Sequence, residues 1–404
     1  MADGKFSGKV LPSEARGVIA VRSLVALILS LAVGLSVSLA CGEVRAGGVT
    51  VEKLLLQGLE LIAQGRTREA ETVVHDVLVQ QPDFRLANVV LGDLYLMKTG
   101  KLTQFASGVA GYDKELADFL AEAKVRLENT KSSPQDAMPG ELLRISANHR
   151  YALVVDLSRS RLHLFQNKQS IPEKVADFYI TIGKEGGGKE QQGDKKTPIG
   201  LYRITGRLES GSLPGFYGAG ALPLDYPNSW DQLHHRTGSG IWLHGTPVET
   251  YSRPPRASDG CVVLTNPDFK VLSQWLAVDD PVVLTQHIDW IPADEWRRRR
   301  ELISQRIDQW RSDWTRLKGT GVLRYYSTQY RSGHLDDALW NQLQDGNVAL
   351  KDPGILSYPG VEKMVVVTWE GVPQTDTGNR GVPMTQYWRL EENSDWKIIF
   401  EPNG

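Results

Sequence analysis

The sequence predicts a multidomain chain: an α-helical repeat module, a mainly β domain and an α+β C-terminal domain, in that order. Three patterns predict this. Apolar residues recur at helical spacing over 50–128, short alternating strands fill 150–286, and a helical stripe followed by paired strands fills 294–404. The length of 404 residues suits two to four domains at about 100–200 residues each.

The composition supports folded domains and argues against one class of partner. Apolar residues make up 41% of the chain, enough for sizeable cores. The formal charge is −2, so there is no excess of positive charge to attract a phosphate backbone. We therefore expect no nucleic acid as a partner.

Residues 1–46 have the pattern of an export signal. Basic residues come first, at Lys5, Lys9, Arg16 and Arg22. The uncharged apolar run Leu24–Ala40 follows, and small residues provide cleavage points after Ala40 and after Ala46. We expect either a cleaved signal peptide or a retained membrane anchor.

Cleavage after Ala46 would leave Cys261 as the only cysteine, because the chain has two and Cys41 would be removed. A lone cysteine in an exported protein cannot form an internal disulfide. It is either a small buried apolar residue or a free reactive thiol. The residues around Cys261 must decide between these alternatives.

Residues 50–128 match themselves at a spacing of 34 residues, with Gly58 aligned to Gly92 and Leu61 to Tyr95. This resembles tetratricopeptide repeats, although a plain helical hairpin is an equal alternative. Fewer than three repeats seldom stand alone, so we expect the module to pack on another part of the chain. Its expected role is partner binding or positioning.

The segment 129–140 is polar and contains Pro, Gly and Ser, which predicts a linker. The β domain at 150–286 follows it. Its Gly- and Lys-rich stretch 184–200 lacks Gly-Lys-Ser/Thr at P-loop spacing, so we expect a surface loop there.

A helix is predicted from Asp294 onward. Its apolar stripe consists of Trp296, Ile303, Ile307, Trp310 and Trp314. Arg297–Arg300 are expected on its solvated face, with contact to an anionic polymer as the alternative. The long paired strands that follow give the segment 294–404 a resemblance to the nuclear transport factor 2-like cone, a fold that assigns no activity by itself.

His244 and Cys261 form the candidate catalytic pair. His244 ends the predicted strand in "GIWLHG", and Cys261 enters another from the turn "SDGC". An imidazole can take the thiol proton and make a nucleophilic thiolate. The Gly245 carbonyl would orient the imidazole, Ser258 and Gly260 would shape the turn, and amides at Gly260 and Cys261 would form an oxyanion hole.

Four stretches around this pair resemble the bacterial L,D-transpeptidase (YkuD-like) catalytic domain, over about a third of the chain. They are "YALVVDLSRSRLHLF", "GDKKTPIGLYRI", "RTGSGIWLHGTP" and "ASDGCVVL". Two residues depart from the family pattern: Asp259 stands where a histidine is common, and Val263 where arginine or asparagine is common.

The resemblance implies cysteine-dependent acyl transfer on peptidoglycan stem peptides in the periplasm or cell envelope, through a thioester on Cys261. It implies no metal and no cofactor. The adjacent imidazoles His234 and His235 lack the spacing of a zinc site.

Two alternatives stay open. The stretch "YPNSWDQLHHRTGSGIWLHG" resembles a branch of the family that releases a lipoprotein from peptidoglycan, which would make the reaction hydrolysis and place His235 and Arg236 at the substrate. The second is an inactive scaffold whose helical repeats bind a lipoprotein or another envelope protein.

Overall fold

A computed structural model describes residues 47–100, 113–130, 136–317, 319–334, 348–373, 384–392 and 395–402. The predicted signal segment, 1–46, lies outside them. The chain divides into two compact units. The first, the helical unit, comprises Met1–Ser132, Thr246–Pro255 and Thr265–Asp268. The second, the β unit, comprises Ser133–Gly245, Arg256–Leu264 and Phe269–Gly404.

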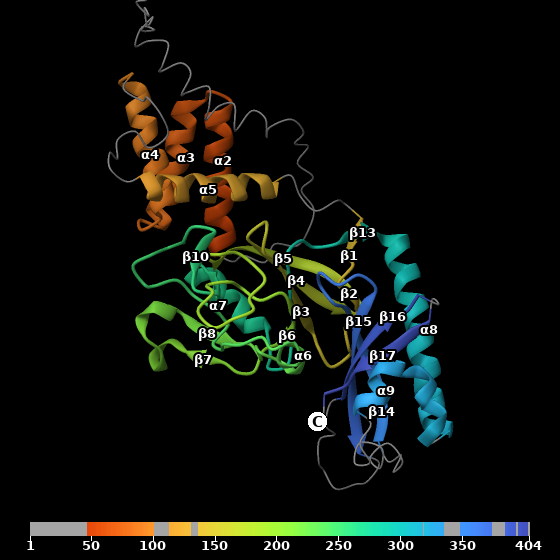
Figure 1. The fold of residues 1–404 in the computed structure, drawn as a ribbon. Helices are drawn as coiled ribbons and strands as arrows, with labels where there is room; N and C mark the ends of the chain where they lie inside the picture. Colours follow the sequence, from red (N-terminus) through yellow and green to blue (C-terminus); the bar gives the residue numbers. More distant parts are fainter. Residues whose placement is uncertain are drawn as a thin grey trace, which may run out of the picture. The chain divides into compact units, whose positions relative to one another are not determined.

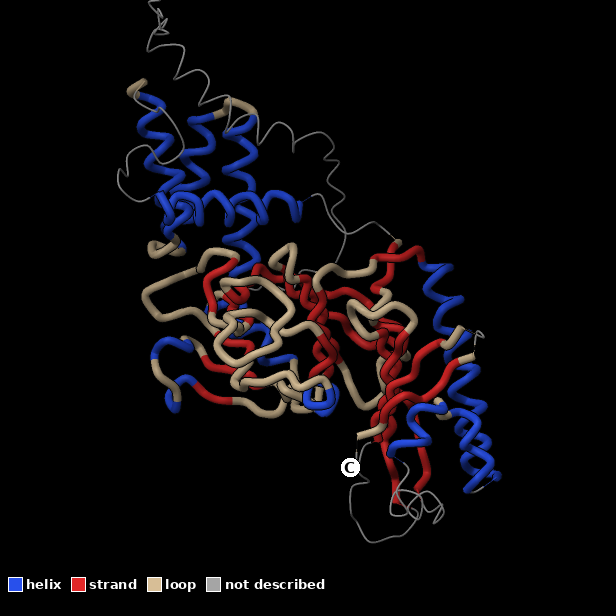
Figure 2. The backbone as a smooth tube through the Cα atoms, viewed as in Figure 1, coloured by secondary structure: helices blue, strands red, loops and turns tan. Residues whose placement is uncertain are grey.

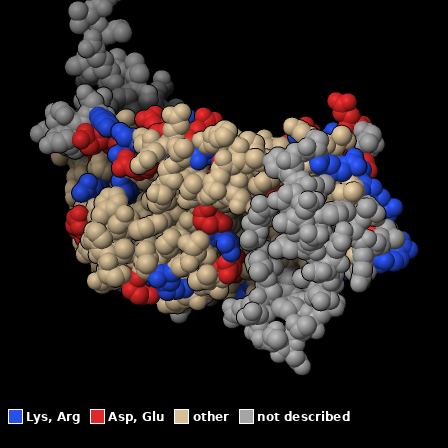
Figure 3. All heavy atoms as spheres, turned by 60° about the horizontal axis from the view of Figure 1, so that its bottom comes forward, with Lys and Arg blue, Asp and Glu red and all other residues tan. Residues whose placement is uncertain are grey.

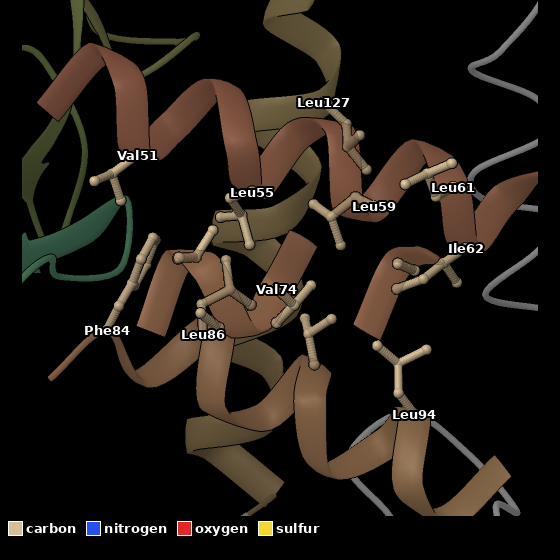
Figure 4. Packing of buried hydrophobic residues seen from close by; sticks show 14 of the residues in the cluster. Val51, Leu55, Leu59, Leu61, Ile62, Val74, Phe84, Leu86, Leu94 and Leu127 are labelled. Atoms are coloured by element: carbon tan, nitrogen blue, oxygen red, sulfur yellow. The ribbon is translucent and has the colours of Figure 1, made fainter. Parts of the chain in front are cut away.

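In the helical unit, the predicted helices are confirmed (Figure 1). They are α2 (Gly47–Ala63), α3 (Thr67–Gln80), α4 (Arg85–Lys98) and α5 (Asp113–Thr130). Aliphatic side chains from all four helices meet in one core (Figure 4). No helix among the described residues is both long and apolar enough to cross a bilayer.

Gly58 and Gly92, which align in the self-match, have different surroundings. A Cβ on Gly58 would lie 2.8 Å from Val74 Cγ2, so α2 and α3 need glycine there to pack this closely. A Cβ on Gly92 would meet nothing within 4 Å. The two aligned glycines are therefore not equivalent in packing.

The first part of the β unit is a ten-stranded sheet in the order β6-β12-β3-β4-β5-β11-β9-β8-β7, with β10 paired to β5. The strands predicted over 150–286 are confirmed, and Figure 2 shows the long loops between them. The strands are β3 (Tyr151–Asp156), β4 (Arg161–Lys168), β5 (Ile171–Gly183), β6 (Gly200–Arg203), β7 (Leu208–Glu209), β8 (Gly220–Pro223), β9 (Trp242–His244), β10 (Arg256–Ser258), β11 (Val262–Leu264) and β12 (Pro281–Thr285). The helices are η1 (Ser210–Ser212), η2 (Gly215–Tyr217), α6 (Ser229–Leu233) and α7 (Asn266–Trp275), whose first three residues belong to the helical unit.

The second part of the β unit is a helix against an antiparallel sheet, as predicted. Its helices are α8 (Ala293–Leu317), η3 (Gly319–Tyr325) and α9 (Thr328–His334). Its strands are β14 (Val348–Ser357), β15 (Met364–Pro373), β16 (Met384–Leu390) and β17 (Trp396–Phe400). Trp310 of α8 is fully buried and packs on Trp369 and Trp388 of the sheet.

The polar side of α8 carries the arginines of the predicted solvated face. Arg298 pairs with Asp294, Arg299 with Glu295, and Arg300 lies 5.2 Å above the ring of Trp296. The two ion pairs are exposed and lie within one helix, so they contribute little to stability, whereas Trp296 is buried.

The prediction of a linker over 129–140 is wrong at its C-terminal end. β1 (Ala137–Pro139) pairs with β13 (Trp290–Pro292), and β2 (Leu142–Arg144) adds a strand to the C-terminal sheet beside β14. These short strands are specified by partners more than a hundred residues away, which local composition does not reveal. The C-terminal sheet is thus completed by a strand that precedes the 150–286 segment.

A buried polar network lies in the C-terminal sheet around Glu401. Glu401 accepts hydrogen bonds from Gln386 Nε2 at 2.5 Å and Tyr326 OH at 3.0 Å. Trp369 and Trp388 both donate to Gln386 Oε1. Burial raises the pKa of Glu401 to about 7 despite the hydrogen bonds that oppose the shift.

This raised pKa predicts a pH-dependent stability. A carboxyl group whose pKa is higher in the folded state stabilises the fold below its unfolded pKa of 4.5, and this stability is lost as pH rises through about 7. The unfolding free energy of Glu401→Gln minus that of the wild type should rise by about 3 kcal/mol from pH 4.5 to pH 9. Urea denaturation at the two pH values measures this.

The matched control is Glu362→Gln, which changes an exposed glutamate between β14 and β15. It should leave the pH dependence of unfolding unchanged. A Glu401→Gln variant whose stability relative to wild type is the same at both pH values would contradict the prediction.

Candidate active site

Two parallel neighbouring strands position the candidate pair. β9 and β11 align Leu243 with Val262 and His244 with Val263. Aligned residues on neighbouring strands point to the same face of a sheet, and side chains alternate along each strand. Cys261 lies immediately before β11 and two residues before Val263, the residue that pairs with His244.

The imidazole of His244 is oriented by the next residue. His244 is 1% exposed, and its Nδ1 lies 2.7 Å from the Gly245 carbonyl oxygen. A carbonyl oxygen can only accept, so Nδ1 carries the proton. In the neutral ring the lone pair is then on Nε2, the nitrogen that a general base would use.

Tyr217 packs against the imidazole of His244. Its ring makes an edge contact with His244, with centroids 5.0 Å apart, and also packs on Trp242 at 4.9 Å. Burial raises the pKa of the Tyr217 hydroxyl, and the charge of a Cys261 thiolate close by raises it further. Tyr217, which has no signal in the sequence, thus contacts His244 and lies within electrostatic range of Cys261.

The turn Ser258–Cys261 is closed by a single hydroxyl. Ser258 Oγ donates to the Cys261 carbonyl at 2.6 Å and accepts from the Gly260 amide at 3.1 Å. Gly260 has φ +132°, and a Cβ there would lie 2.9 Å from the Lys196 carbonyl oxygen. Only glycine suits this position. The Gly260 amide, assigned to the oxyanion hole from the sequence, instead has a hydrogen bond within the turn.

Thr197 supports the same turn from the loop before β6. Its hydroxyl donates to the Gly260 carbonyl at 2.9 Å and accepts from the Gly183 amide, also at 2.9 Å. Thr197 is fully buried. The threonine of "KKTPIG" thereby connects the end of β5 to the residue before Cys261, a role that only the three-dimensional contacts reveal.

The sulfur of Cys261 is half-buried and lies 3.3 Å from the carbonyl oxygen of Gly240. Gly240 immediately precedes Ile241 and β9, in the quoted stretch "RTGSGIWLHGTP". The thiol thus lies beside the segment that leads into β9, the strand that carries His244.

His235 and Arg236 have different surroundings from that pair. His235 is exposed, with φ +55°. Arg236 Nη1 donates to Asp231 Oδ1 at 2.8 Å, and Asp231 is fully buried in α6. The observed contacts tie Arg236 to α6 and not to Cys261 or His244.

The two departures from the family pattern also have defined positions. Asp259 is exposed and pairs with Lys184 at 2.9 Å. Val263 is buried between Thr181 of β5 and His244 of β9. An apolar side chain therefore lies beside the imidazole, where an arginine would have brought a charge.

The described residues contain no group of three or more His, Cys, Asp or Glu side chains placed to hold a metal ion. On the face drawn in Figure 3, described basic and acidic side chains are interspersed. This pattern suits a chain with 46 basic and 48 acidic residues.

The family comparison identifies the class of this domain. Residues 150–284 match the YkuD model, the L,D-transpeptidase catalytic domain. The match runs from β3 to all but the last residue of β12 and includes the whole of the site described above.

Two solved structures are similar over most of their own length. Bd1075 of Bdellovibrio bacteriovorus has 27% identity and a TM-score of 0.54, with 66% of this chain and 98% of that chain covered. The helical cell shape determining protein Pgp2 of Campylobacter jejuni has 20% identity and a TM-score of 0.53, with 65% and 95% covered, and shows likeness of fold. Among curated proteins, none matches this chain.

The support from Thr197 predicts a measurable effect on the thiol. Thr197→Val removes the hydroxyl, leaving the Gly260 carbonyl and the Gly183 amide each without this hydrogen bond. We expect a stability loss of about 2 kcal/mol and about tenfold slower alkylation of Cys261. Urea denaturation and the rate of reaction with iodoacetamide measure the two effects.

Thr197→Ser keeps the hydroxyl and is the matched control, expected to react at nearly the wild-type rate. Wild-type alkylation by a folded Thr197→Val variant would show that the hydroxyl does not position the turn.

Proposed function

We propose that this protein is a cysteine acyltransferase of the L,D-transpeptidase type, acting on peptidoglycan stem peptides. The observation that carries the proposal is the β9–β11 register, which pairs His244 with Val263, two residues after Cys261. The family match over 150–284 supports the substrate class.

In the proposed first step, Nε2 of His244 takes the proton of the Cys261 thiol. The thiolate attacks the carbonyl carbon of the peptide bond that follows the L-centre of a diamino acid. The Nδ1–Gly245 bond keeps the imidazole in the tautomer that this step needs, and stabilises the imidazolium that forms. The tetrahedral intermediate collapses to a thioester as His244 protonates the leaving amine.

In the second step, His244 removes a proton from the incoming nucleophile, which attacks the thioester carbonyl and regenerates the thiol. An acceptor amine produces a cross-link, the reaction we propose, whereas water produces a shortened stem. The exposed side chain of His235 and the half-exposed Arg236 are candidates for contact with substrate.

We further propose that the signal in 1–46 exports the chain to the periplasm or cell envelope, where peptidoglycan lies. We interpret α2–α5 as a tetratricopeptide-like module, supported by their successive helical hairpins, and α8 with β14–β17 as a nuclear transport factor 2-like cone. Pgp2 is named for determining helical cell shape. A role in wall remodelling and cell shape is the corresponding proposal for this chain.

The pair is tested by substitution. Cys261→Ala should abolish turnover of purified muropeptides while changing the unfolding free energy by less than about 1 kcal/mol, because the sulfur is only half-buried. His244→Ala should slow thioester formation at least ~100-fold without changing the products. Product masses, and the mass of the adduct with a carbapenem, measure these effects.

The same assay distinguishes transfer, hydrolysis and an inactive scaffold. Cross-linked dimers from the wild-type protein support transfer, and shortened stems alone indicate hydrolysis. Cys261 that forms no adduct in a folded protein would refute both and favour a scaffold. Unfolding of Cys261→Ala would show a core role for the cysteine.

A further inference from the structure

Both strands of the candidate pair continue into the helical unit. β9 ends at His244, Gly245 belongs to the β unit, and Thr246–Pro255 belongs to the helical unit. β11 ends at Leu264, and Thr265–Asp268 again belongs to the helical unit. We call Thr246–Pro255 the anchor loop.

A buried ionic network fastens the anchor loop to α5. Ser252 Oγ donates to Glu122 Oε1 at 2.7 Å, and the same oxygen accepts from Arg126 Nη2 at 2.9 Å. Arg126 also donates to Glu52 of α2 at 2.9 Å. Glu122 and Arg126 are each 1% exposed. Buried charges of this kind are costly to disturb, so the position of the loop is strongly held.

Apolar and polar contacts hold the rest of the anchor loop. The ring of Tyr251 lies 4.6 Å from that of Phe84, which is fully buried. At the start of the loop, Thr246 Oγ1 donates to the Tyr251 carbonyl, and the Thr246 carbonyl accepts from Asn266 Nδ2 at 2.9 Å. Thr246, the residue after Gly245, is therefore held by hydrogen bonds with two other residues of the helical unit, Tyr251 and Asn266.

One peptide group connects this anchoring to the imidazole. The Gly245 carbonyl and the Thr246 amide lie in a single plane, because the peptide bond does not rotate freely. The atom that accepts from His244 Nδ1 is thus rigidly joined to a nitrogen that belongs to the helical unit. The direction of the Gly245 carbonyl therefore depends on the orientation of the Thr246 amide, with which it shares a plane.

We propose that Ser252 and Thr246 are positioning residues for the reaction, through which the helical unit holds the Gly245 carbonyl against His244. This inference rests on the proposed function of the Cys261–His244 pair. It assigns the helices a role in the chemistry, separate from any binding of partners.

The test uses the full chain and two readouts: alkylation of Cys261 by iodoacetamide, and kcat and KM on muropeptides. Ser252→Ala and Thr246→Val each remove one hydroxyl from the anchor. Each variant should slow alkylation about tenfold and lower kcat by a similar factor, with KM unchanged. The second variant keeps the test valid if the first does not fold.

Two control variants distinguish an effect on the position of the Gly245 carbonyl from an effect on the stability of the fold. Ser273→Ala removes a hydroxyl from a serine of α7 that is as buried as Ser252, at 8% exposure. Val74→Ala weakens the helical core at a residue that is not part of the anchor loop. Both should react at the wild-type rate while folded.

Wild-type alkylation rates in folded Ser252→Ala and Thr246→Val would overturn the inference and leave the proposed function intact. Equal slowing by Val74→Ala would overturn it too, because general destabilisation would then explain the effect. A wild-type Cys261 no more reactive than an ordinary thiol would overturn the proposed function, and this inference with it.

Discussion

The hydrogen bond from His244 Nδ1 to the Gly245 carbonyl is the constraint on which the site depends. It joins neighbouring residues, so no distant carboxylate is needed to orient the ring. Its direction decides the tautomer, because a carbonyl oxygen has no proton to give. A backbone acceptor is also uncharged. The ring is thus oriented without a carboxylate as its hydrogen-bond partner, and Val263 keeps the neighbouring strand position apolar.

The thiol is held by a different means. Its turn depends on two hydroxyls, Ser258 inside the turn and Thr197 outside it, and on a glycine where a Cβ would collide with the Lys196 carbonyl. Each hydroxyl both donates and accepts, so each satisfies two backbone groups that would otherwise be buried without partners. The turn that carries Cys261 is therefore held through its backbone groups, and the cysteine side chain stays partly exposed.

The sequence predicted what is encoded locally. The helices, the stripe of α8, the strand ending at His244 and the Ser258–Cys261 turn all follow from short-range patterns, and the His–Gly and Gly–Cys pairs marked the candidate site. Tyr217, Thr197 and Ser252 escaped prediction because their roles come from partners distant in sequence. β1 and β2 were missed for the same reason, because their pairing partners, β13 and β14, lie more than a hundred residues away.

The origin of β2 restricts how such a chain could be assembled from modules. The edge strand of the C-terminal sheet, β2, comes from residues that precede the whole YkuD match. In addition, Trp230 of α6 stacks on Tyr387 of β16, with centroids 4.7 Å apart. A fragment that ends after β12 would lack Tyr387 and expose the ring of Trp230. A C-terminal segment moved without β2 would leave the edge of β14 unpaired and prone to aggregation. Recombination during evolution would therefore have had to transfer the two parts of the β unit together.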